Sequence, residues 1–291
     1  MNFHYLVEKV ANQKIESRPF KHIEIVDFFN QEHFREITSC SEVDLPPAKD
    51  DEDLIFQLGA LGYECIPFPG TTQNIAEYLS WHSVKKAFCR SNYVNPELCE
   101  GLGMTFRLVT PKSGILQELH DFFNSKAFLS CITDRFAIQL EGTYSDNGLQ
   151  KYLDGYEISP HPDIRQKAIT YMININPRQD SESVEFHTHY MRLIDSRKYI
   201  KEYWDSNPDV ERCWVPWQWC RTEKMQKKNN SFVLFSPGND TIHAIRAAYD
   251  HLAGQRTQFY GNLWYKNFPK LRMSNWKEFI DDTNFAGPPK S

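Results

Sequence analysis

The stretch YEISPHPDIRQKAITYMININP, residues 156–177, decides how the rest of the chain is interpreted. It places His161 and Asp163 two residues apart, directly before an apolar run that predicts a β-strand. Side chains at positions i and i+2 of an extended segment point to the same side, so both groups could face one cavity. An imidazole and a carboxylate together suit a divalent ion such as Fe(II). Because His-x-Asp also arises by chance, a metal site needs a third ligand from another strand.

The chain downstream of residue 135 has the texture of a β-protein. Strands are predicted from short runs that include RFAIQLEGTY (135–144), AITYMININP (168–177), SVEFHTHYMRLI (183–194) and RTQFYGNLWYK (256–266). Turn-rich segments such as SDNG (145–148) separate the runs. Six or more short strands of this kind favour a β-sandwich or a barrel.

The upstream part is expected to be largely helical. QNIAEYLSWHSVKKAFC (73–89) and SGILQELHDFFNSKAFLSCITDRF (113–136) carry apolar residues at three- and four-residue spacing, which predicts amphipathic helices. The fold class expected is therefore α+β with a mainly β core, buttressed by N-terminal helices. No linker separates the halves, so one domain is predicted over 1–291. It comprises an N-terminal part at about 1–134, a core at about 135–268 and an extension at 269–291.

Composition limits the partners and the compartment that are expected. A net charge of −5 gives no electrostatic case for binding nucleic acid. No run approaches the 18 apolar residues of a membrane span, and no signal peptide is evident at the start, so we expect a cytoplasmic protein. The seven cysteines form no C-x-x-C pair, which predicts reduced thiols and argues against a zinc knuckle.

A candidate for the third ligand is His243, which lies in a strand-like run just after a turn in SPGNDTIHAIRAAY (236–249). Arg256 follows thirteen residues later. With these residues the chain resembles the 2-oxoglutarate/Fe(II)-dependent dioxygenases, specifically their prolyl-4-hydroxylase-like branch. The resemblance implies a double-stranded β-helix, or jelly roll, with His161, Asp163 and His243 as the metal-binding facial triad. It also implies Arg256 as the anchor of 2-oxoglutarate, with Fe(II), 2-oxoglutarate and O2 as the cofactors.

The resemblance implies an oxidoreductase that oxidises an unactivated C–H bond and releases succinate and CO2. The expected substrate is a small molecule such as an amino acid, a sugar-like unit or a specialised metabolite, in a biosynthetic step. Related halogenases lack the triad carboxylate, so Asp163 favours hydroxylation, desaturation or oxidative cyclisation. Two alternatives stay open: a protein or peptidyl hydroxylase of the prolyl-4-hydroxylase type, and a non-catalytic jelly-roll binding module. The substrate and the oligomeric state are not indicated by the sequence.

Further residues are candidates for contacts within the site. Tyr171 is predicted to contact 2-oxoglutarate. Arg246 competes with Arg256, although it follows His243 too closely for the spacing of the family. His187 and His189 share a face and form a rival metal pair of the cupin type, yet contact with substrate is the preferred interpretation. Contacts near the substrate are predicted for a set of five: His187, His189, Arg246, Tyr260 and Trp264. The segment 195–211 is interpreted as a charged, partly helical insertion.

Overall fold

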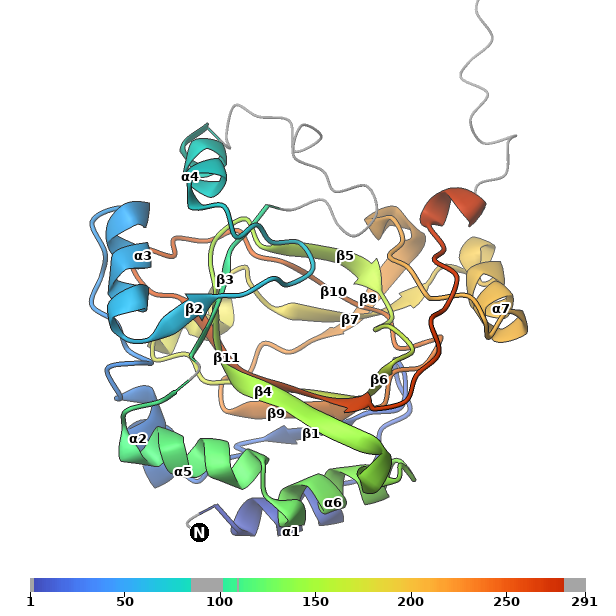
Figure 1. Ribbon diagram of the computed structural model, residues 1–291, viewed down its shortest axis with the longest axis horizontal. Helices are drawn as coiled ribbons and strands as arrows, with labels where there is room; N and C mark the ends of the chain where they lie inside the picture. Colours follow the sequence, from blue (N-terminus) through green and yellow to red (C-terminus); the bar gives the residue numbers. More distant parts are fainter. Residues whose placement is uncertain (1–2, 85–101, 109, 280–291) are drawn as a thin grey trace, which may run out of the picture.

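The computed structural model describes residues 3–84, 102–108 and 110–279 (Figure 1). The helices are α1 (Tyr5–Asn12), α2 (Gln31–Thr38), α3 (Asp51–Ala60), α4 (Ile75–Val84), α5 (Gly114–Phe123), α6 (Lys126–Arg135) and α7 (Tyr199–Ser206). The strands are β1 (Ile23–Val26), β2 (Tyr63–Cys65), β3 (Thr105–Leu108), β4 (Thr143–Tyr152), β5 (Glu157–His161), β6 (Lys167–Asn174), β7 (Thr188–Leu193), β8 (Cys220–Met225), β9 (Ser231–Phe235), β10 (His243–Arg246) and β11 (Arg256–Tyr265).

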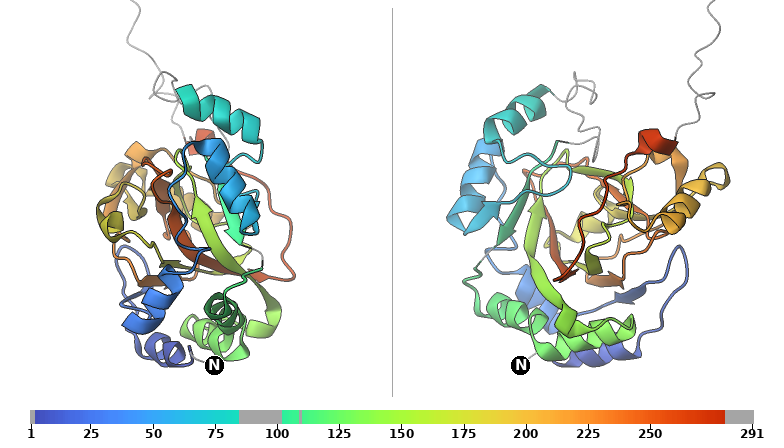
Figure 2. Two further views of the ribbon diagram at one scale, coloured as in Figure 1. Left: turned by 90° about the vertical axis from the view of Figure 1, so that its left-hand side faces the viewer. Right: turned by 45° about the vertical axis from the view of Figure 1, so that its right-hand side comes forward.

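The strands form two antiparallel sheets. The larger has the order β1-β9-β6-β11-β4-β3-β2, and the smaller has the order β5-β10-β7-β8. From β4 onward the chain passes back and forth between the two sheets, so that β4, β11, β6 and β9 lie opposite β5, β10, β7 and β8 (Figures 1 and 2). This topology is the double-stranded β-helix, and the predicted fold class is confirmed.

Helices cover the outer face of the larger sheet. Figure 1 shows α1, α5 and α6 together beneath β1, β4 and β9. Phe123 of α5 stacks on Phe259 of β11 with ring centroids 4.3 Å apart, and Phe128 of α6 meets Tyr171 of β6 at 5.6 Å. β6 is covered by the helices on one face and by the smaller sheet on the other, which accounts for the burial of every residue from Ala168 to Asn174.

The register of β6 assigns its side chains to two environments. Tyr171 lies opposite Gly261 of β11, and a Cβ atom at position 261 would stand 2.1 Å from Tyr171 Cζ. The glycine therefore makes room for the tyrosine ring, which packs with the helices. Because side chains alternate along a strand, Thr170 and Met172 point to the interior between the sheets.

Two of the predicted elements need correction, and a third is described only in part. The helix expected over 113–136 is two helices, because the chain turns at Asn124 and Ser125 caps α6 by accepting a hydrogen bond from the N–H of Phe128. The strand expected over 135–144 is wrong, since a 3₁₀ turn at Leu140–Gly142 occupies this region and β4 begins at Thr143. Of the helix expected over 73–89, residues 85–89 lie outside the described residues.

The turn predicted at SDNG (145–148) is also wrong. These residues lie within β4, which pairs with β11 along its whole length, from Thr143 to Tyr152. The Asp146 carboxylate accepts a hydrogen bond from Arg107 on the neighbouring β3 at 2.5 Å. Long-range strand pairing thus outweighs the local turn preference of this sequence.

Other expectations concern the segments around the core. The segment 195–211 contains α7 and is partly helical, as predicted. Of the extension at 269–291, residues 280–291 lie outside the described residues. Cys40, Cys65, Cys131, Cys213 and Cys220 are free thiols. Within the described part of the chain, no helix has the length and apolar character needed to cross a membrane.

Candidate metal centre

The three predicted metal ligands meet at one end of the smaller sheet. His243 begins β10 and is the direct cross-strand partner of His161, the last residue of β5. Their ring centroids are 4.5 Å apart. Asp163 lies two residues beyond β5, with one carboxylate oxygen 4.0 Å from His243 Nε2. One ligand atom from each of the three residues lies within 4.8 Å of the others, a spacing that a single metal ion can bridge.

Backbone carbonyl groups fix the tautomer of both histidines. The Nδ1 atom of His161 lies 2.8 Å from the carbonyl oxygen of Ser159, and that of His243 lies 3.0 Å from the carbonyl oxygen of Thr241. A carbonyl oxygen only accepts hydrogen bonds, so Nδ1 carries the proton and Nε2 keeps its lone pair. Burial, reinforced by the neighbouring imidazole, lowers the pKa of His161 to about 3, and burial also lowers the pKa of His243. Both rings are therefore neutral donors at physiological pH.

Two side chains that the sequence interpretation missed hold the Asp163 carboxylate. Lys167 donates to Oδ1 at 2.7 Å, and the Thr170 hydroxyl donates to Oδ2 at 2.6 Å. Burial alone would raise the pKa of Asp163, but the charge of Lys167 holds it well below its usual range. Asp163 is therefore an ionised ligand. Lys167 and Thr170 follow Asp163 by four and seven residues, and this spacing is the only local signal that could have indicated them as its partners.

An inner cavity leads from the three ligands to Arg256, the first residue of β11. Arg256 is 3% exposed, its Nη2 donates to the Thr188 hydroxyl at 3.0 Å, and its guanidinium lies 4.4 Å from the centre of the Tyr152 ring. Among the described residues no carboxylate forms an ion pair with it. A buried guanidinium without an acidic partner is costly, so this end of the cavity suits a bound anion. The lining includes Tyr152, Met172, Thr188, Gln258 and Tyr260.

An outer cavity of about 430 Å³ opens on the other side of the ligands. It shares His161, Asp163 and Lys167 with the inner cavity, so the metal centre lies where the two cavities meet. Its walls come from the segment 66–69, the ends of β4 and β11, and the segments 212–214 and 273–274. Most of the wall is apolar, and its charged members among the described residues are Arg107, Asp146, Asp163, Lys167 and Arg212.

The other predicted contacts divide into two groups. Tyr260 lines the inner cavity and its hydroxyl lies 3.0 Å from Lys167 Nζ, whereas Trp264 lines the outer cavity. Tyr171 does not line either cavity, because the register of β6 turns it toward the helices. The predicted contact between Tyr171 and 2-oxoglutarate is therefore corrected.

His187, His189 and Arg246 lie outside both cavities. His187 Nε2 is 3.2 Å from the carbonyl oxygen of Glu182, and His189 Nδ1 is 3.0 Å from the Thr222 hydroxyl. On β7 it is Thr188, between the two histidines, that faces Arg256. The Arg246 side chain is 41% exposed and stacks on Trp217. Strand alternation thus removes all three from the predicted contacts near the substrate.

A second group of metal-ligand side chains lies at α3 and α4. The two ring nitrogens of His82 lie 2.7 Å from Asp51 and 3.0 Å from Asp154, and His251 Nε2 lies 2.6 Å from Asp51. The Asp154 N–H donates to His251 Nδ1 at 2.8 Å. Each ring nitrogen is thus engaged within the protein, and the group joins α3 and α4 to two loops. The sequence interpretation missed it because its members come from four separate segments.

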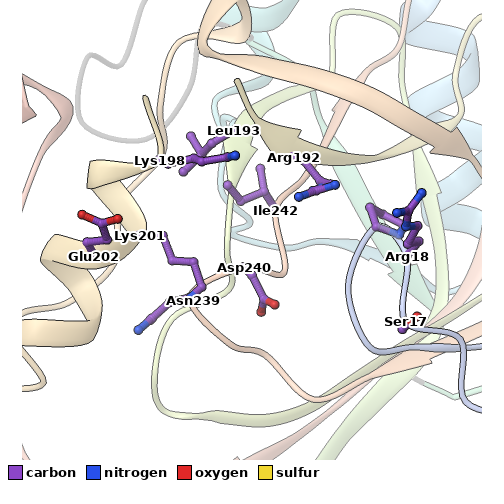
Figure 3. A pocket seen from close by; sticks show the side chains of 11 residues that line it. Ser17, Arg18, Arg192, Leu193, Lys198, Lys201, Glu202, Asn239, Asp240 and Ile242 are labelled. Atoms are coloured by element: carbon purple, nitrogen blue, oxygen red, sulfur yellow. The ribbon is translucent and has the colours of Figure 1, made fainter. Parts of the chain in front are cut away.

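A third hollow, of about 540 Å³, lies away from the metal centre (Figure 3). It is bounded by the N-terminal segment, the end of β7 and α7. Figure 3 shows Arg18, Arg192 and Lys201 around it together with Glu202 and Asp240. None of the three predicted metal ligands lines this hollow.

No family model matches the chain, and no curated protein matches it. Among solved structures, a prolyl-4-hydroxylase from Pseudomonas putida is 11% identical, with 91% of this chain and 100% of that chain covered and a TM-score of 0.45.

Two further solved structures are similar at the same low identity. A prolyl hydroxylase from Trichoplax adhaerens, in complex with a hypoxia inducible factor peptide fragment, is 11% identical, with 91% of each chain covered and a TM-score of 0.41. HygX from Streptomyces hygroscopicus, with nickel, 2-oxoglutarate and hygromycin B bound, is 11% identical, with 77% of this chain and 90% of that chain covered and a TM-score of 0.33. At these identities and TM-scores the similarities carry no argument about function, so the function is inferred from the residues of this chain.

Proposed function

We propose that the protein is a non-haem Fe(II)- and 2-oxoglutarate-dependent oxygenase that oxidises a C–H bond of a small molecule. One observation carries the proposal. Two neutral imidazoles and an ionised carboxylate converge within 4.8 Å, and a cavity joins them to Arg256, a buried guanidinium that has no acidic partner in the described part of the chain. Two histidines and one carboxylate on one side of a metal leave positions open, as in non-haem Fe(II) oxygenases.

The residues of the chain fit the two groups that this chemistry needs. His161, Asp163 and His243 would hold the metal, and Arg256 would bind the distal carboxylate of 2-oxoglutarate through its planar two-point donor. The Fe(II) and 2-oxoglutarate bound there would supply the oxidising chemistry, in which 2-oxoglutarate, O2 and a C–H bond give succinate, CO2 and an alcohol.

The protein itself orients these groups and limits water. Lys167 and Thr170 fix both oxygens of the Asp163 carboxylate. The Thr188 hydroxyl and the Tyr152 ring fix the Arg256 guanidinium. Phe68 and Tyr260 line the inner cavity with ring centroids 5.4 Å apart, and these rings would limit the access of water to the reacting atoms.

A small-molecule substrate is supported by the outer cavity. Its volume of about 430 Å³ lies within the range of small-ligand sites. The same residues at the metal would also serve hydroxylation of a peptide. Succinate formation stimulated by a proline-containing peptide, and by no small molecule, would favour that alternative. Metal binding without any consumption of 2-oxoglutarate would favour a binding module.

The proposal is tested by removing one metal ligand. His243→Ala should lose Mn(II) binding by calorimetry and should lose succinate formation with Fe(II) and 2-oxoglutarate. The matched control is His189→Ala, which removes a histidine from the neighbouring strand β7 and should leave both measurements unchanged. Wild-type metal affinity in the His243→Ala variant would contradict the assignment.

A further inference from the structure

Arg212 is a buried cation in the wall of the outer cavity. The residue is 5% exposed. Among the described residues its guanidinium forms no ion pair and no side-chain hydrogen bond, and its Nε is shielded without a partner. The nearby Arg165, in contrast, donates to the backbone carbonyl groups of Val210 and Trp204.

The other charges of the outer cavity neutralise one another. Arg107 pairs with Asp146 at 2.5 Å and also donates to Gln150, while Lys167 pairs with Asp163 at 2.7 Å. Of the described residues, three cations and two carboxylates therefore line the cavity, and both carboxylates are engaged. Arg212 is the one of these three cations that has no carboxylate partner.

A buried guanidinium that lacks an ion-pair partner destabilises the protein when no anion is bound. Burial, together with the charge of Arg165, lowers the pKa of Arg212 to about 10, so the group is still charged at neutral pH. The charges of Glu211, Asp163 and Asp240 oppose this lowering, but none of these carboxylates forms an ion pair with the guanidinium. The same cavity lining holds the apolar side chains of Trp214, Trp264 and Met273. Leaving a buried charge without a partner costs free energy, which a bound anion would offset.

We propose that Arg212 binds a carboxylate of the substrate and thereby selects molecules with an apolar body and one negative charge. The inference rests on the proposed function, because that function makes the outer cavity the substrate side of the metal centre. A planar carboxylate matches the paired N–H groups of a guanidinium. One cation whose charge no described carboxylate balances suits a monoanion, whereas a phosphate dianion would require a second such cation. The apolar walls receive the rest of the molecule.

This role differs from the one proposed for Arg256. The two arginines line different cavities, and the metal ligands lie where those cavities meet. The distal carboxylate of 2-oxoglutarate is assigned to the inner guanidinium. Arg212 is therefore a specificity-determining residue for the substrate and is not needed to hold 2-oxoglutarate.

The test is a binding measurement on the full chain without metal or 2-oxoglutarate. The probes are matched pairs of N-acetyl amino acids and their neutral carboxamides, with aliphatic and aromatic side chains, and inorganic phosphate as a separate probe. Affinity is followed by tryptophan fluorescence and by the shift of the melting temperature. The wild-type chain should bind the acids more tightly than the amides, and phosphate should bind less tightly than the best acid.

Four variants locate the effect. Arg212→Met and Arg212→Gln should bind the acids about 10- to 100-fold more weakly, as expected for the loss of charge-assisted hydrogen bonds. Both should be at least as stable as the wild-type chain, because they remove a buried charge without a partner. Arg256→Met should keep the preference for acids, as should Arg221→Met, which alters an exposed arginine of β8.

The outcomes separate this inference from the proposed function. Equal affinity for acids and amides in the wild-type chain, tighter binding of phosphate, or a preference lost only in Arg256→Met would each overturn the role of Arg212. None of these results depends on metal or on turnover. Conversely, a chain that never forms succinate would refute the oxygenase proposal while the preference for carboxylates could still be measured.

Discussion

Thr170 offers a direct test of how the metal centre is built. Its hydroxyl donates to Asp163 Oδ2 at 2.6 Å, and the residue is fully buried. Thr170→Val keeps the shape of the side chain and removes this hydrogen bond together with the longer one, 3.3 Å, that the hydroxyl donates to Asn262 Oδ1. The carboxylate would retain Lys167 on Oδ1 but would lose the contact that orients its other oxygen.

The magnitude follows from the nature of this contact. A hydrogen bond to a charged acceptor contributes about 1.5–3 kcal/mol. Removing a residue that orients a metal ligand typically weakens metal affinity about 10- to 100-fold, or about 1.4–2.7 kcal/mol. We therefore expect Mn(II) to bind Thr170→Val about 10- to 100-fold more weakly than the wild-type chain, as measured by titration calorimetry.

Thr105 provides the matched control. It is another fully buried threonine on the larger sheet, and its hydroxyl has no hydrogen-bond partner among the described residues. Thr105→Val should therefore bind Mn(II) like the wild-type chain and should be no less stable. Unchanged affinity in Thr170→Val, or an equal loss in both variants, would refute the orienting role of the Thr170 hydroxyl.

Two further predictions concern the anion site and acid stability. Arg256→Lys keeps a charge but loses the two-point donor, so the KM for 2-oxoglutarate should rise about 10- to 100-fold with a smaller change in kcat, measured by succinate formation; an unchanged KM would place 2-oxoglutarate elsewhere. Burial opposes ionisation of Glu42, yet the Ser113 hydroxyl and the N–H groups of Ser113 and Lys112 lower the pKa of Glu42 to about 2. The folded-state pKa lies below the ordinary value of 4.5, so this stabilisation of up to about 3 kcal/mol is present above pH ~4.5 and is lost as the pH falls toward 2. Urea unfolding should show Glu42→Gln less stable than wild type at pH 7, with the gap closing in acid; a gap independent of pH would contradict the role of this carboxylate.

The sequence was sufficient to predict which three residues meet as candidate metal ligands. It was insufficient to predict which face of its strand every other side chain occupies. His161 and Asp163 are close in the chain, so their convergence needs only an extended segment. Tyr171 was misassigned because its direction depends on the register between β6 and β11, which places it over Gly261. No local pattern specifies that register.

Long-range packing accounts for the remaining omissions. The segment SDNG has strong turn preference and yet forms the middle of β4, because β11 pairs with it throughout. No sequence pattern indicated Arg212 as a cavity residue, because its position depends on the irregular segment that crosses the mouth of the barrel. There the N–H of Val215 donates to the carbonyl oxygen of Pro160, which brings Arg212 to the metal centre.

Arg256 and Arg212, which have no acidic partner among the residues that the structure describes, are held by different kinds of structure. This difference bears on how specificity could change. Arg256 is the cross-strand partner of Tyr152 on β4, and its strand also pairs with β6 from Gln258 onward, so the sheet itself holds its position. Arg212 lies on an irregular segment, where few strand hydrogen bonds constrain the backbone. Substitutions in such a segment can alter a binding surface without disturbing the sheets that carry the metal ligands. In the proposed assignment, the site for 2-oxoglutarate therefore belongs to the rigid core, whereas the choice of substrate belongs to the chain that closes the barrel mouth.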